Sequence, residues 1–264
     1  MRIAALLVAA LLTGPATAAL AQDRPPPPVP VEEWSQRRVT TLGEAIFRQD
    51  QAAQVATDTL LAHLNGSPLP PGFAGWIVVD QGRDQLVRFI RMDGEIARPA
   101  FDVPVRGGRA GALTAVESGE LSPSEQAQFR ARLTAANNIG RLRCSPQMNA
   151  VVLNDPDSDE WLVWLLTSTN DANIVPMGGH YRFRISADGA SVVRRDMLSN
   201  SCLPMSRAAP NGGQAVALTT NQIVSNGPVE THVFLSLLNR MPIYIAADNK
   251  LFEVNGARIR EVRR

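Results

Sequence analysis

Three dipeptides in which Asp or Asn precedes Gly mark tight turns along this chain of 264 residues. They are Asp93-Gly94, Asp188-Gly189 and Asn255-Gly256, and each stands between two runs rich in β-branched, aromatic or arginine residues. Such dipeptides favour two-residue turns, because the central positions need a positive φ that Asn, Asp and Gly adopt most readily. Strands joined by turns this short must pair antiparallel. The sequence therefore predicts β-meanders.

Strand-like runs flank these turns and recur along most of the chain. We expect strands at 73–80, 85–92, 95–105, 149–153, 161–167, 179–186, 190–198, 229–237, 243–247, 250–254 and 258–262. The run at 161–167 is apolar without alternation, which is typical of a strand covered on both faces.

Two segments carry the signals of helices. Thr41 and Glu44 have the spacing of a capping box ahead of apolar residues at helical intervals, and Asn65-Gly66 supplies a stop. The sequence Ser122-Pro-Ser-Glu125 combines an N-cap, a first-turn proline and a box glutamate, so a second helix should run to about Asn137. We therefore expect an α+β fold of antiparallel β-meanders packed with two main helices.

One internal similarity bears on this architecture. The segment 88–94 begins Arg-Phe and ends Asp-Gly, and the segment 182–189 does the same. A helix followed by a meander would then occur twice, as an αβββ pseudo-repeat. Such a pattern also arises from composition alone in an arginine-rich chain with many hairpins, and we favour that simpler interpretation.

The chain has two cysteines, Cys144 and Cys202. An even pair in an exported chain indicates one disulfide, and neither cysteine belongs to a CxxC motif. The bond would close a loop of 59 residues, for which the chain-entropy estimate is about 4 kcal/mol of stabilisation.

The N-terminal residues 1–21 resemble a signal peptide. Arg2 precedes an apolar run from Ile3 to Leu12, and Ala19-Leu-Ala21 is a small-x-small site, so we expect cleavage after Ala21. Residues 22–40 follow as a proline-rich tether, with five prolines between positions 23 and 30. This leaves 41–264 as one compact domain, or as two with a boundary at 106–121.

Composition narrows the class of function. The chain has 26 basic and 25 acidic residues, and loss of Arg2 with the signal peptide leaves 25 of each. A neutral mature chain does not favour nucleic-acid binding. No later apolar run approaches 18 residues, so we expect no transmembrane segment in the mature protein. Lys250 is the only lysine, a bias typical of GC-rich bacterial genomes, and the periplasm or the medium is the expected location.

The strongest candidate site combines two predicted strands. His180, Arg182 and Arg184 share one face of the strand 179–186, and Glu230 and His232 share one face of the strand 229–237. The arginines would suit a small anionic ligand, and the histidines with Glu230 would suit a metal. The simpler alternatives are a solvated sheet face and hydrogen-bonded histidines at the edge of the core.

Two other motifs are weaker. Residues 155–160 space three aspartates as in the first half of an EF-hand loop, but the glycine and the final ligand are missing. A solvated acidic turn is the favoured interpretation. Residues 107–111 are glycine-rich but match no phosphate-binding motif, so we expect a flexible loop. No catalytic residue, metal or cofactor is assigned.

These observations favour an exported soluble binding or interaction module without evident catalytic activity. Its partner would be a periplasmic protein or a small anionic ligand. The alternative is an exported hydrolase that uses carboxylates or a metal near His180, Glu230 and His232. A structural envelope protein with the tether as spacer is a third hypothesis.

Overall fold

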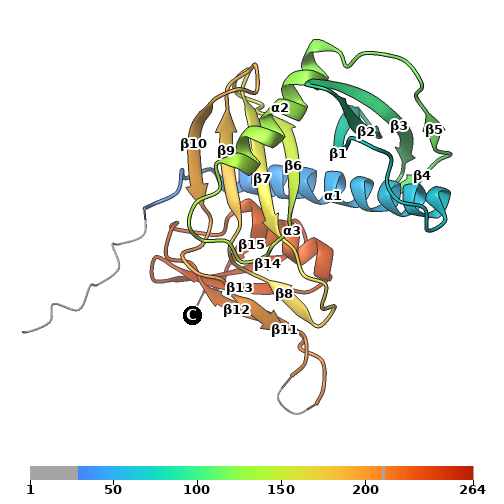
Figure 1. Cartoon of the computed structure of the whole chain (residues 1–264). Coiled ribbons are helices and arrows are strands. Elements are labelled where there is room, and N and C mark those ends of the chain that lie inside the picture. The colour runs from blue at the N-terminus through green and yellow to red at the C-terminus, as the bar shows by residue number, and fades with distance from the viewer. Residues whose placement is uncertain (1–28, 210–211, 264) are drawn as a thin grey trace, which may run out of the picture.

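The computed structural model describes residues 29–209 and 212–263, and it has the expected α+β architecture (Figure 1). The predicted signal peptide and residues 22–28 of the predicted tether lie outside the described residues. The helices are α1 (Gln36–Leu64), α2 (Pro123–Asn137) and α3 (Glu230–Asn239). In the described part of the chain, no helix has the length and apolar character needed to cross a membrane.

The first sheet is an antiparallel meander packed between two helices. Its main strands are β1 (Phe73–Gln81), β2 (Asp84–Asp93) and β3 (Ile96–Arg106), with the short strands β4 (Arg109–Ala110) and β5 (Thr114–Ala115) beside β3. The second half of α1 packs on one face, where Ala56 and Leu60 meet Phe89. The first residues of α2 cover the other face, where Phe129 meets Ile90.

The second sheet is also a meander with both faces covered. Its order is β10 (Val192–Met197), β9 (Tyr181–Ile185), β7 (Trp161–Thr167) and β6 (Met148–Asn154). The helix α2 packs on one face through Ala131 and Ala135, which meet Phe183. The first half of α1, together with α3, covers the opposite face at Trp164. All seven residues of β7 are buried, which confirms the prediction from its unbroken apolar run.

The third sheet carries one parallel pair. Its order is β12 (Leu218–Asn221), β13 (Ile243–Ala247), β14 (Lys250–Asn255) and β15 (Arg258–Glu261), and β12 pairs parallel with β13. Parallel neighbours need a crossover connection, and α3 supplies it. The helix packs on this sheet, where Ser236 Oγ bonds Val254 O at 3.2 Å. A two-stranded arm of β8 (Ile174–Pro176) and β11 (Pro204–Ser206) projects below the sheets (Figure 1).

The short strands β4, β5, β8, β11 and β12 were not predicted, and two longer elements also differ from the sequence predictions. The helix α1 begins at Gln36 with Ser35 as its N-cap, so residues 36–40 of the predicted tether are helical. Val39 explains the earlier start, because it continues the buried stripe of Leu42 and Ile46 toward the N-terminus by one turn.

The second difference is α3, which was predicted as a strand at 229–237. Every residue from Glu230 to Ser236 is buried. Burial on all sides removes the exposed face that usually marks a helix, and the apolar run within this segment is short, so its sequence is ambiguous between strand and helix. Glu230 and His232 therefore do not share a strand face.

The predicted disulfide is present between Cys144 and Cys202, with a Cα–Cα distance of 5.4 Å. It joins the loop after α2 to the segment after β10. Gly179 makes room for it, because a Cβ at this position would lie 2.3 Å from Cys144 Sγ. Gly178 is similarly crowded by Ser201 O at 2.3 Å. The absence of a side chain at Gly178 and Gly179 is therefore required by packing within the protein, at the disulfide and at Ser201.

The contact between α1 and α3 generates a prediction at Gly43. Alanine in a helix interior usually stabilises by about 1 kcal/mol relative to glycine. Here a Cβ would lie 2.5 Å from Val233 Cβ and 2.8 Å from Glu230 O, and overpacking of this kind costs roughly 1–3 kcal/mol. We expect Gly43→Ala to lower the free energy of unfolding in urea.

The exposed Thr41→Ala on the same helix is the control, and it should change stability by less than about 0.5 kcal/mol. A Gly43→Ala protein that is more stable than the wild type would contradict the close packing of α1 on α3.

Candidate functional site

The predicted arginine stripe lies on β9 as expected, but its environment differs. Arg182 and Arg184 share one face of the strand, and Tyr181, Phe183 and Ile185 occupy the other. The arginine face is covered by α3 and by residues 31–35 rather than by solvent, so that Arg182 is only 3% exposed.

Arg182 is the centre of a buried ion cluster. Its Nη2 lies 2.7 Å from Asp196 Oδ2, and its Nη1 lies 3.1 Å from Glu230 Oε1. The same Nη2 donates to Glu32 O at 2.8 Å, and the guanidinium stacks 3.7 Å from the ring centroid of Trp34. Arg182 therefore connects β9 to β10, to α3 and to the segment that precedes α1.

Glu230 completes this cluster from the first turn of α3. It is fully buried, and its Oε1 also accepts a hydrogen bond from Trp164 Nε1 at 2.7 Å. A carboxylate near a helix N-terminus is stabilised by the helix dipole. Removing one partner from such a buried pair leaves an uncompensated charge, and the usual cost is about 3–5 kcal/mol.

The same arrangement occurs between the first sheet and α2. Arg88 on β2 lies 2.7 Å from Asp102 on β3 and 2.6 Å from Glu125 in the first turn of α2. Both Arg88 and Arg182 pair with an aspartate fourteen residues later on the neighbouring strand. The two similar segments noted in the sequence thus occupy equivalent positions in their meanders.

The two candidate histidines bind the backbone. His180 Nδ1 accepts from Thr167 N at 3.0 Å, so that Nε2 carries the proton and donates to Pro176 O at 2.8 Å. His232 Nδ1 accepts from Val229 N at 3.0 Å. Burial lowers the pKa of His180 to about 4 and that of His232 to about 3. Both imidazoles are therefore neutral at neutral pH.

A metal would need several ligands around one point. Within residues 29–209 and 212–263, no group of three or more His, Cys, Asp or Glu side chains is arranged to hold a metal ion. The structure brings Arg182 to Glu230 but gives His180 and His232 separate backbone partners. Ligand binding by the set His180, Arg182, Arg184, Glu230 and His232 stays a prediction.

The acidic turn at 155–160 forms ion pairs with arginines of other elements. The Asp155 carboxylate is buried, with Arg38 of α1 at 2.8 Å and Arg184 of β9 at 3.7 Å. Arg184 also reaches Glu160 at 3.4 Å and Glu32 at 2.9 Å. Residues 156–159 of the turn are exposed, as predicted, but Asp155 is buried and connects α1 to the second sheet.

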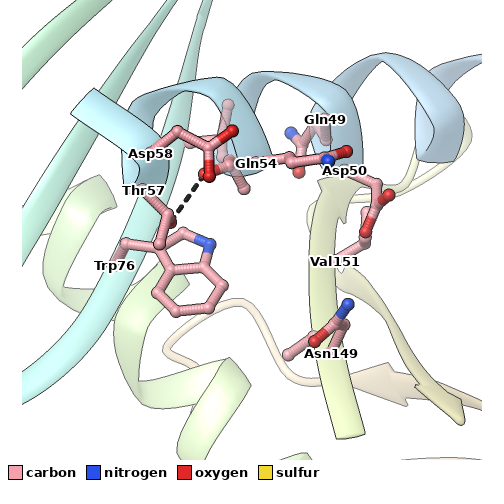
Figure 2. Close-up of a pocket in the computed structure, with 11 residues that line it drawn as sticks. Gln49, Asp50, Gln54, Thr57, Asp58, Trp76, Asn149 and Val151 are labelled. Carbon is pink, nitrogen blue, oxygen red and sulfur yellow. Dashed lines mark hydrogen bonds between the residues drawn. The ribbon is translucent and has the colours of Figure 1, made fainter. Parts of the chain in front are cut away.

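A cavity of about 230 Å³ lies elsewhere, between the two large sheets (Figure 2). The edge strand β1 of the first sheet forms one side, the edge strand β6 of the second sheet forms the other, and the middle of α1 closes it. Its lining consists of Gln49, Asp50, Ala53, Gln54, Thr57, Asp58, Trp76, Val78, Asn149, Ala150 and Val151.

Side chains of α2 keep the two sheet edges in place. Gln128 Nε2 bonds both Val78 O on β1, at 2.9 Å, and Val152 O on β6, at 3.4 Å. Arg132 Nη1 donates to Trp76 O at 2.8 Å and stacks 4.3 Å from the ring centroid of Trp76. The edges are thus bridged by side chains at these carbonyls, and the space beside the bridge remains open as the cavity.

Asp50 is the unusual acid of this cavity. Burial raises its pKa from 3.8 to about 6, opposed by a hydrogen bond with Asn149. A desolvated carboxylate with a shifted pKa in a cavity is a physical indicator of a functional site. Asp50, Gln54 and Asp58 recur at intervals of four residues, so they share one face of α1.

The cavity lining is acidic and incompletely hydrogen-bonded. It contains two aspartates and no Arg, Lys or His, and neither Asp50 nor Asp58 forms an ion pair within the described residues. Gln49 also lines the cavity, and its side-chain amide forms no hydrogen bond within the described residues. The amide is not among the fully buried polar atoms, so it is open to the space of the cavity.

The two aspartates are too far apart for glycosidase chemistry. Eight residues separate them on α1, which corresponds to about 12 Å along the helix axis. Retaining enzymes hold their carboxyl groups about 5 Å apart and inverting enzymes roughly 6.5–9.5 Å apart. The spacing suits contact with an extended ligand.

Comparisons with known proteins identify no relative, because no family model, curated protein or solved structure matches this chain. The sequence held one usable signal, the polar stripe of Asp50, Gln54 and Asp58 on the predicted helix. A polar helix face of this kind usually faces solvent, so the stripe alone does not predict that it lines a cavity.

The raised pKa of Asp50 generates a prediction for Asp50→Asn. Folding favours the protonated acid, so the stability that Asp50 contributes is present below its unfolded pKa of 3.8 and is lost as pH rises through about 6. Asparagine does not ionise, so the variant does not lose stability in this pH range. Between pH 4 and pH 8 the variant should gain up to about 3 kcal/mol relative to the wild type in urea unfolding.

Glu44→Gln, at an exposed position of α1, is the control for the loss of one carboxylate from the same helix. Parallel pH profiles for the wild type and Asp50→Asn would show that Asp50 is not desolvated.

Proposed function

We propose that this protein is an exported binding module without catalytic activity, and that the cavity between β1 and β6 holds a cationic group. The observation that carries the proposal is the lining of the cavity. Two aspartates without ion-pair partners line the cavity together with Trp76, and no Arg, Lys or His is among the lining residues.

The chemistry of the lining favours an ammonium or guanidinium group. The partly desolvated Asp50 carboxylate attracts a cation more strongly than it would in bulk water, and the exposed Asp58 adds a weaker attraction. One face of the Trp76 ring already stacks against Arg132, so cation–π attraction to a ligand is left only at the other face. The amide oxygens of Gln49, Gln54 and Asn149 are further acceptors for the N–H groups of such a ligand.

A hydrolase has less support than a binding module. The metal version places the chemistry at His180, Glu230 and His232, but the His180 ring and the Glu230 carboxylate already bind groups within the fold. The carboxylate version needs a close pair of acids, which Asp50 and Asp58 do not form on α1.

Export is part of the proposal. The leader-like residues 1–21 support it, and the disulfide fits an oxidising compartment such as the bacterial periplasm or the medium. A ligand met there must be present outside the cytoplasm.

Binding of spermidine, a small polycation, tests the proposal. In isothermal titration near pH 7.5, we expect binding that weakens about tenfold near pH 5, because protonation of Asp50 with its pKa of about 6 removes one of the two charges. Asp50→Asn and Asp58→Asn should each weaken binding, whereas the exposed Glu44→Gln should not.

Maltotriose, which is neutral and hydroxyl-rich, is the ligand control. Binding of maltotriose but not spermidine would assign the cavity to uncharged sugars and contradict the proposal. Spermidine binding that is unchanged in Asp50→Asn and Asp58→Asn would place the cation elsewhere.

A further inference from the structure

We propose that the cationic ligand of this cavity also carries a carboxylate, which Arg207 binds, and that the ligand class is short basic peptides with a free carboxyl end. The inference rests on the proposed function of the cavity. The ligand would then have two contacts of opposite charge, its cation with the acidic cavity and its carboxylate with Arg207 in the hollow beside Asp50.

The cavity continues past Asp50 into a second hollow of about 320 Å³. Asp50, Gln54 and Asn149 line both spaces, so the two spaces adjoin at the Asp50–Asn149 contact. The second hollow extends toward Arg207 beside β11 and toward Asn239 at the end of α3.

Arg207 is an arginine without an acidic partner. Its Nη2 bonds Asn239 Oδ1, and its Nε is buried without a hydrogen-bond partner. Within the described residues no carboxylate lies at ion-pair distance from its guanidinium. Asp171 lines the same hollow, but its Oδ1 accepts from Asn173 N at 2.8 Å. The buried Nε is closed to a ligand, but Nη1 forms no hydrogen bond within the described residues and is not fully buried, so it is the group that would bind a ligand carboxylate.

The presence of sheet-edge strands in the cavity wall favours a peptide as the ligand. Residues 149–151 of β6 and residues 76 and 78 of β1 line the cavity, and both strands are at the edge of their sheets. The carbonyls of Trp76 and Val78 on β1 are occupied by Arg132 and Gln128, so the edge left for a ligand is that of β6. Extended peptides bind such edges through their main chain. A polyamine has no backbone of this kind.

The length of the site sets the length of the ligand. Asp58 and Asp50 are about 12 Å apart along α1, and the second hollow lies beyond Asp50. An extended peptide covers about 3.3 Å per residue. A ligand of about three to five residues therefore spans from the acidic cavity toward Arg207.

A matched pair of peptides tests the inference. The probes are Lys-Ala-Ala with a free carboxyl end and the same tripeptide with an amidated end, titrated by calorimetry near pH 7.5. Attraction to the acidic cavity alone favours the amide, because the amide carries one more net positive charge. We expect the opposite order, with the free acid binding about tenfold more tightly through its charge-assisted bonds to Arg207.

Arg207→Gln should abolish the preference for the free acid and leave the affinity of the amide unchanged. The exposed Arg83→Gln, on the turn between β1 and β2, should change neither. Circular dichroism melts of both variants establish that they fold.

The outcomes separate the inference from the proposed function. If the amide binds at least as tightly as the free acid and Arg207→Gln has no effect, the inference is wrong and the cation site stands. If neither peptide nor spermidine binds, both proposals fail.

Discussion

The buried contact of Arg182 with Asp196 and Glu230 is the interaction on which the arrangement of this protein depends. One guanidinium joins two strands of the second sheet to the first turn of α3, and it also holds the backbone of Glu32. Each charge is costly to bury alone, so the elements that carry them must stay together. The similar cluster of Arg88 fixes the start of α2 to the first sheet in the same way. Each meander is thus tied to the helix that follows it in the chain.

This arrangement explains why a cavity exists between the sheets. The helix α1 is long enough to pack against both sheets, which remain separate around it (Figure 1). Because α2 is tied to the first sheet and packs on the second, its Gln128 bridges the facing edges of β1 and β6. The edges do not pair with each other beside this bridge, and the polar stripe of α1 lines the space that remains.

The sequence predicts most of the fold but little of the site. Strand alternation and the Asp-Gly and Asn-Gly turns are local signals, so ten of the fifteen strands of the described residues, α2 and the disulfide were predicted. The short strands β4, β5, β8, β11 and β12 carry too few residues for such a signal and were missed. The helix α3 was missed because it is buried on all sides and its apolar run is too short to distinguish a helix from a strand. Arg182 was expected at a surface, since alternation gives the face of a residue but not what covers that face. Asp50 became notable only when folding placed β6 and Asn149 beside it.

A double-mutant cycle measures directly whether the buried ion clusters hold each sheet against the helix that follows it in the chain. Arg182→Met and Glu230→Gln, alone and together, give a coupling free energy from urea unfolding. We expect a coupling above about 2 kcal/mol for this buried pair. The matched cycle with Arg88→Met and Glu125→Gln, where Arg88 is 19% exposed, should give a smaller coupling of the same sign. A coupling below about 0.5 kcal/mol for Arg182 and Glu230, as for residues that do not interact, would contradict the account.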